Sequence, residues 1–190
     1  MPDRDVKTVR DLLYYQYAKI IAKRAFSINN GIGAKREHYG FIKKTFRELK
    51  IGGKSWSDII REDWQLVESE KKCVYCGSEI DLQREHIVPR SLQIKPECPN
   101  CDRIQSIHNQ AWACKHCNTL KGTMGLYEFF KSMYPNERKF YDFIPPLLEK
   151  KYLKTIYYCH ECAQTLEKVR LKADRELSVL DIDFILHLEG

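Results

Sequence analysis

All eight cysteines of this chain occur in C-x-x-C pairs, and this arrangement constrains the fold more than any other feature of the sequence. Two intervening residues let both sulfurs of a pair reach one tetrahedral ion from a tight turn. We therefore expect zinc-binding thiolates rather than disulfides or redox dithiols. The pairs are Cys73/Cys76, Cys98/Cys101, Cys114/Cys117 and Cys159/Cys162.

The zinc interpretation depends on a reducing compartment, and the start of the chain favours one. Its first residues carry charges of both signs and lack the apolar core and cleavage site of a secretory signal. Apolar stretches fall far short of the roughly 20 residues of a membrane span. We expect a folded cytoplasmic protein, in which closely spaced cysteines bind metal.

The net charge of +6 is concentrated in the N-terminal part, where residues 20–56 carry nine Lys and Arg against two acids. Such a surface favours a polyanionic partner. An ordinary helical scaffold with outward lysines explains the same pattern, and both interpretations stay open. The predicted phosphate contacts are Lys35, Arg36, Lys43, Lys44 and Arg47.

Hydrophobic periodicity predicts helices in residues 1–70. One helix carries Val9, Leu13 and Tyr17, a second carries Ile42, Phe46 and Leu49 and ends at Gly52-Gly53, and a third begins near residue 55. Residues 71–125 contain short β-like runs. Further on, a helix stops at Pro135, another is expected over Glu161–Lys172, and the tail is either strand or helix.

Three stretches belong together in one predicted unit: CVYCG at 73–77, REHIVPRS at 84–91 and HNQAWACKHCNTLKG at 108–122. They predict a hairpin followed by a helix near Asn118, with one zinc joining the 73/76 and 114/117 pairs. Glu85 and His86 are neighbours and face opposite sides of a strand. To serve one site they need the strand to twist or end there, which Pro89 favours.

These stretches resemble the HNH endonuclease family in its zinc-stapled form, over about 50 of the 190 residues. The resemblance implies a ββα-metal core that hydrolyses DNA to 5′-phosphate and 3′-hydroxyl ends. By matched position, His86 is the general base, and Glu85 and Asn118 bind catalytic Mg²⁺ or Mn²⁺. Asn109 braces the loop between the strands, and Lys121 is a phosphate contact.

The chain departs from the family pattern in two places. Glu85 stands where aspartate is frequent, and a longer loop with Cys98 and Cys101 replaces a glycine pair. If the hairpin uses one zinc, the 98/101 pair remains to join Cys159/Cys162 in a second zinc site. The predicted α+β chain thus has a helical, basic, DNA-binding region (1–70), an HNH core (71–134) and a C-terminal extension (135–190) with a second zinc knuckle.

Two other classes of function remain open. A zinc-ribbon module that binds DNA or RNA without cutting, or a zinc-stabilised protein-interaction scaffold, also explains the cysteines. The set of Glu85, His86, Asn109 and Asn118 favours the nuclease, with DNA as the preferred substrate over RNA. We favour a restriction or defence role. One such unit cuts one strand, so a double-strand cut requires a homodimer or successive nicks.

Overall fold

The computed structural model describes residues 4–26, 32–56, 71–92, 102–169 and 177–189, without the side chains of residues 24, 32–35 and 187–189. These residues form helices and one two-stranded antiparallel sheet, which confirms the predicted α+β class. Two compact units are present, Met1–Ser57 with Leu166–Ser178 and Asp58–Thr165 with Val179–Gly190. No helix in the described ranges has the length and apolar character to cross a bilayer.

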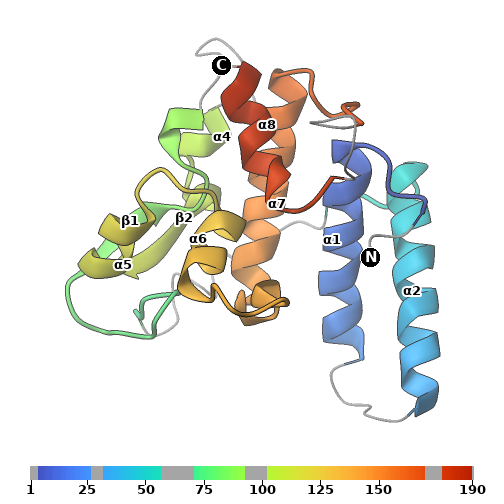
Figure 1. Cartoon of the computed structure of the whole chain (residues 1–190), viewed down its shortest axis with the longest axis horizontal. Coiled ribbons are helices and arrows are strands. Elements are labelled where there is room, and N and C mark those ends of the chain that lie inside the picture. Colours follow the sequence, from blue (N-terminus) through green and yellow to red (C-terminus); the bar gives the residue numbers. More distant parts are fainter. Residues whose placement is uncertain (1–3, 27–31, 57–70, 93–101, 170–176, 190) are drawn as a thin grey trace. The chain divides into compact units, whose positions relative to one another are not determined.

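The first unit is built on helices α1 (Val9–Ala25) and α2 (Ile32–Lys50), which lie side by side and antiparallel (Figure 1). A capping box fixes the start of α1, because the Thr8 hydroxyl accepts from the Asp11 N–H while the Asp11 carboxylate accepts from the Thr8 N–H. Gly52 follows α2 with φ of +73°, the left-handed conformation that stops a helix. The predicted stop at Gly52-Gly53 is confirmed.

The apolar positions that repeat at helical spacing are buried, which confirms the first two predicted helices. Tyr15 meets Phe46 edge-on across the helix pair, with ring centroids 5.7 Å apart. The third predicted helix falls in residues 57–70, outside the described residues. The buried apolar side chains of this pair include Val9, Leu13, Tyr17, Ile42, Phe46 and Leu49.

A segment from the C-terminal part completes the first turn of α1. The Leu166 and Lys168 carbonyls accept from the backbone N–H groups of Arg10 and Val9. These N–H groups have no partner inside the helix, so the segment satisfies them. Arg10 also pairs with Glu167 at 2.9 Å.

The second unit contains the predicted hairpin, formed by β1 (Leu82–His86) and β2 (Gln110–Cys114). Its register places Glu85 opposite Ala111 and His86 opposite Gln110. Helix α5 (Lys115–Lys121) follows directly and packs on both strands. Between the strands, the described chain forms η1 (Arg90–Leu92), α4 (Asp102–Gln105) and η2 (Ile107–Asn109).

Helix α5 begins earlier than predicted. Cys114 is its N-cap and accepts from the Cys117 N–H at 3.4 Å, so the second cysteine pair itself forms the first helical turn. Asn118 therefore lies inside the helix and does not open it, and Lys121 is its last residue. Gly122 ends the helix with φ of +50°.

The unit is completed by α6 (Leu126–Met133), η3 (Phe140–Phe143), α7 (Pro146–Cys162) and α8 (Asp181–Glu189). Helix α6 confirms the helix expected before Pro135, and α8 shows that the tail is helical. The helix predicted over Glu161–Lys172 is wrong, because α7 ends at Cys162 and Gln164 has φ of +59°. The apolar spacing of α7 continues into the last cysteine pair, which therefore ends a helix instead of preceding one.

An aromatic core lies beneath the hairpin. Tyr75, in the turn of the first cysteine pair, meets Phe129 of α6 edge-on at 5.0 Å between ring centroids. Tyr127 and Tyr152 meet in the same way at 5.3 Å. These side chains are buried; the first contact fixes the turn of the first cysteine pair to α6, and the second fixes α6 to α7.

Candidate active site

Two cysteine pairs meet at the end of the hairpin. The sulfurs of Cys73, Cys76, Cys114 and Cys117 all lie within 4.8 Å of one another. Tetrahedral zinc with Zn–S bonds of about 2.3 Å places its sulfurs about 3.8 Å apart. The Cys76 and Cys114 sulfurs are 3.7 Å apart, so this cluster has the donors and the spacing to hold a zinc ion.

The local backbone explains how the first pair forms a knuckle. Gly77 has φ of +77° and donates its N–H to the Cys73 carbonyl, which closes the turn. Burial opposes ionisation of the Cys73 thiol, but N–H groups from Cys114, Cys76 and Tyr75 outweigh it and bring its pKa to about 7. The sulfur is thus surrounded by donors, as thiolate ligands commonly are.

The second predicted zinc site stays a prediction. Cys98 and Cys101 lie outside the described residues. Cys159 and Cys162 are buried at the end of α7, and Cys162 is disulfide-bonded in this structure. A disulfide and zinc ligation are alternative states of one sulfur, and the zinc content of the protein distinguishes them.

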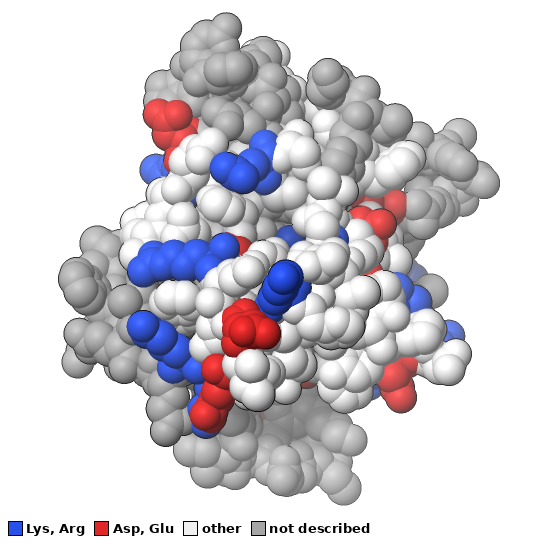
Figure 2. All heavy atoms as spheres, turned by 90° about the vertical axis from the view of Figure 1, so that its left-hand side faces the viewer, with Lys and Arg blue, Asp and Glu red and all other residues white. Residues whose placement is uncertain are grey.

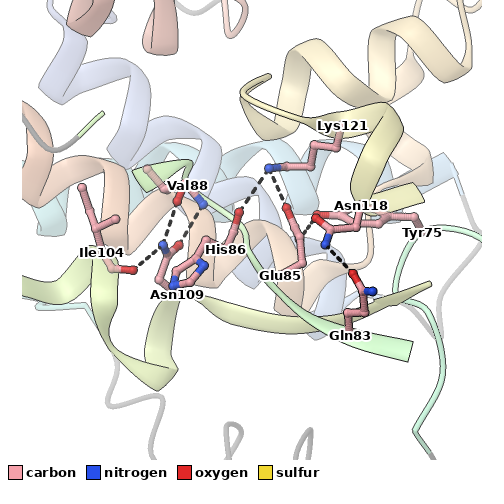
Figure 3. A network of polar contacts seen from close by, with 9 residues as sticks. All are labelled: Tyr75, Gln83, Glu85, His86, Val88, Ile104, Asn109, Asn118 and Lys121. Carbon is pink, nitrogen blue, oxygen red and sulfur yellow. Dashed lines mark hydrogen bonds and ion pairs between the residues drawn. The ribbon is translucent and has the colours of Figure 1, made fainter. Parts of the chain in front are cut away.

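Glu85 lies in a buried polar network on the α5 side of the hairpin (Figure 3). Its Oε1 is 2.6 Å from the Lys121 ammonium, and its Oε2 accepts from the Tyr75 hydroxyl at 2.6 Å. Glu85 is 4% exposed and Lys121 is 1% exposed. Lys121 also donates to the His86 carbonyl at 3.1 Å, so it ties the end of α5 to the end of β1.

Asn118 lies on the same side of the hairpin as Glu85. Its Nδ2 donates to the Gln83 side chain at 3.1 Å, and Gln83 precedes Glu85 by two residues on one face of β1. No hydrogen bond to the Asn118 amide oxygen is found within the part of the chain that the structure describes. The structure therefore brings two predicted oxygen ligands, Glu85 and Asn118, to one region.

His86 is the last residue of β1, so the strand ends there, as expected from the nearby Pro89. Its ring points away from the Glu85 carboxylate in Figure 3 and is half-buried. Burial lowers the pKa of His86, and the positive charges of Arg90 and Lys121 lower it further. The imidazole is therefore neutral at pH 7, the form that can accept a proton.

Asn109 makes the contacts of the expected brace. It is fully buried, its Oδ1 accepts from the Val88 N–H, and its Nδ2 donates to the carbonyls of Val88 and Ile104. These bonds hold the residues after β1 against those before β2. Lys151 of α7 adds a second support by donating to the Gln110 carbonyl at 2.8 Å.

A divalent cation fits the composition of this region. Glu85 and Asn118 supply the oxygen donors that Mg²⁺ and Mn²⁺ prefer. The position beside Glu85 accepts positive charge, because an ammonium already binds there. Glu85 and Asn118 are the residues that would hold such an ion.

The predicted phosphate contacts lie on α2. Arg36, Lys44 and Arg47 are exposed, Lys43 is half-buried over the Tyr39 ring, and the Lys35 side chain is not described. Arg36, Lys43 and Arg47 are spaced seven and four residues apart, which places them on one stripe of the helix. The Lys44 ammonium forms an ion pair with Glu48, with 4.0 Å between Nζ and Oε1.

Four further residues of the region were not predicted from the sequence. The Tyr75 hydroxyl donates to Glu85, and the Gln83 side chain accepts from Asn118. No local sequence pattern reveals these partners. Arg84 and Lys71 lie over the Trp112 ring, at 5.3 and 5.1 Å from its centroid. Arg84 could have been found from the alternation of side chains along a strand, because it lies two residues before His86 and therefore on the same face of β1.

Comparisons with protein-family models, curated proteins and solved structures found no match to this chain.

Proposed function

We propose that this chain is a zinc-stapled HNH endonuclease that cuts DNA with His86 as general base and a divalent cation held by Glu85 and Asn118. The observation that carries the proposal is the arrangement around one hairpin. Glu85 and Asn118 lie on its α5 side, a neutral histidine ends β1, Asn109 braces the strands, and four cysteines clamp the end. A module that only binds nucleic acid does not require this set.

The chemistry divides among the residues. His86, neutral at pH 7, accepts the proton of the attacking water. Asn109 keeps the end of β1 in place through Val88. A bound divalent cation supplies charge stabilisation of the phosphate and of the leaving oxygen. We propose 5′-phosphate and 3′-hydroxyl products.

Two surfaces are proposed to contact phosphates. On the hairpin, Arg84 and Lys71 flank Trp112 on the face of β1 that carries His86. Figure 2, which faces the side of the molecule where the hairpin lies in Figure 1, shows Lys and Arg side chains interspersed with Asp and Glu instead of one continuous basic surface. The basic stripe of α2 is the second surface, defined by Arg36, Lys43 and Arg47.

A second function is favoured by one specific observation. Both carboxylate oxygens of Glu85 already have protein partners in Tyr75 and Lys121. Such a satisfied buried network is typical of a structural role. A zinc-ribbon module that binds DNA or RNA without cutting is therefore the alternative.

The zinc-loaded protein should be incubated with supercoiled plasmid, with and without Mg²⁺ or Mn²⁺. The nuclease converts the plasmid to a nicked form only when the divalent ion is present, and a ligase reseals the nick without prior kinase treatment. Salt-sensitive binding to DNA without any cutting, on plasmids and on RNA, would support the binding module instead.

A further inference from the structure

Lys121 occupies an unusual place for a lysine. Its ammonium is buried, contacts Glu85 Oε1 at 2.6 Å and donates to the His86 carbonyl at 3.1 Å. Lysine is rarely buried without a paired acid, and burying such a pair costs desolvation energy. Tyr75 binds the other oxygen of Glu85 at 2.6 Å. One oxygen of Glu85 is therefore held by a packed hydroxyl, and the other by a cation on a long side chain.

A second buried acid lies near Lys121. Asp183 of α8 is 3% exposed, and its Oδ2 accepts from the Tyr152 hydroxyl at 2.7 Å. Its Oδ1 is buried and has no hydrogen-bond partner among the described residues. An unpaired buried carboxylate oxygen is costly, and it provides an acceptor ready for a donor.

The geometry after α5 brings these groups together. Asp183 packs against Gly125, where any Cβ would overlap its carboxylate. Only three residues separate Gly125 from Lys121, and the positive charge of Lys121 partly offsets the burial that raises the pKa of the Asp183 carboxyl group. The ammonium therefore has two buried acids within its electrostatic range, one bound and one with an open acceptor.

We propose that Lys121 is an internal counter-cation, which the divalent cation replaces at Glu85, and that Asp183 then receives the displaced ammonium. Two cations cannot share one carboxylate oxygen at contact distance without strong repulsion in a buried site. Lys121 balances the charge of Glu85 and holds its carboxylate in position before the ion arrives. Asp183 is then a positioning residue that lowers the cost of moving the lysine. This inference rests on the proposed divalent-cation site of the nuclease.

The test measures binding of Mn²⁺ to the zinc-loaded full chain at pH 7.5, by the electron paramagnetic resonance signal of unbound Mn²⁺. Lys121→Met should bind Mn²⁺ about tenfold more tightly, because the competing cation is gone. Asp183→Asn should bind it about tenfold more weakly, because the position that receives the ammonium loses its negative charge. Lys115→Met, an exposed change on the same helix, is the matched control and should leave binding unchanged.

The double variant isolates the coupling between the two residues. With Lys121→Met in place, Asp183→Asn should have no further effect on Mn²⁺ affinity. Unchanged or weaker binding by Lys121→Met overturns the inference, and so does an Asp183→Asn effect that persists in the double variant. Either result would favour a Lys121 that stays at Glu85 and contacts phosphate.

Failure of the proposed function gives a different result. If wild type and Lys121→Met show no saturable Mn²⁺ binding that Glu85→Gln removes, the divalent-cation site itself is absent. A second measurement covers the case in which Lys121→Met does not fold. In wild-type protein the ¹⁵N signal of the Lys121 ammonium should shift on adding Mg²⁺, and the shift should differ in Asp183→Asn. A signal that saturating Mg²⁺ leaves unmoved overturns the exchange.

Discussion

The Lys121 ammonium lies 2.6 Å from Oε1 of Glu85, and both side chains are almost completely removed from solvent. These residues are 36 positions apart in the sequence, and the pair joins the end of α5 to β1. The carboxylate predicted to bind a metal ion is thus already paired with a cation of the protein. This relationship links the stability of the hairpin to its proposed chemistry.

Tyr75 should contribute measurably to this network. Tyr75→Phe removes the hydroxyl that donates to Glu85 Oε2 and leaves a buried carboxylate oxygen without that donor. We expect a loss of about 2 kcal/mol in the free energy of unfolding, measured by urea denaturation. Tyr134→Phe, at a half-buried ring stacked on Phe143, is the control and should change stability little. Equal stabilities of the two variants would show that the Tyr75 hydroxyl contributes nothing.

Gly125 is predicted to be intolerant of any side chain. A Cβ at this position would overlap the Asp183 carboxylate, which is held by Tyr152. Gly125→Ala should therefore destabilise the protein by about 3 kcal/mol. Gly40→Ala is the opposite case, since nothing lies within 4 Å of its added Cβ in α2, and it should gain about 0.5–1 kcal/mol. A neutral result at Gly125 would contradict the packing against Asp183.

The pH dependence of stability should reveal Asp183. Burial raises its pKa from 3.8 to about 6, with Tyr152 and Lys121 opposing the shift and Glu128 adding to it. The folded chain thus binds this proton more tightly than the unfolded chain. The contribution of this proton to the free energy of unfolding is fully present below about pH 4 and is lost as the pH rises through about 6.

Asp183→Asn should therefore gain stability relative to wild type as the pH rises from 4 to 6, and the difference should be constant above that range. Urea denaturation of both proteins across pH 4 to 8 measures it, with the exposed Asp102→Asn change as control. A difference that does not depend on pH would contradict the raised pKa of Asp183.

The zinc content of the protein should depend on its cysteine pairs. Cys76→Ser should lose one zinc per chain, because its sulfur belongs to the four-cysteine cluster. Cys159→Ser together with Cys162→Ser should lose another if the second site exists, from a wild-type content of two. Zinc released on denaturation, measured with a colorimetric chelator, gives both counts. A wild-type content of one, unchanged in the Cys159/Cys162 variant, would rule out the second site.

The parts of the fold that follow from local pattern were predictable. Helices α1 and α2 follow from apolar spacing, and the hairpin with α5 follows from short β-like runs and a cysteine knuckle. The meeting of the 73/76 and 114/117 pairs was also predictable, because the hairpin brings its own ends together. Each of these features depends on residues close in sequence or on the pairing of the two hairpin strands.

The remaining features depend on tertiary burial, which no local pattern encodes. The resemblance implied that Lys121 contacts phosphate, and only the packing shows it buried against Glu85. Asp183 lies 62 positions after Lys121, in a tail that fits strand and helix equally well from sequence. The helix predicted over Glu161–Lys172 was wrong, because the apolar spacing before the last cysteine pair continues into that pair. The pair therefore ends a helix instead of preceding one.

The measurement that tests the central claim most directly is the rate of plasmid nicking by His86→Ala beside His108→Ala. His108 is an exposed histidine of η2 and serves as the matched control. Removal of the general base should slow Mg²⁺- or Mn²⁺-dependent nicking by about 10²–10⁴-fold, while His108→Ala keeps the wild-type rate. Nicking by His86→Ala at the wild-type rate would contradict the account.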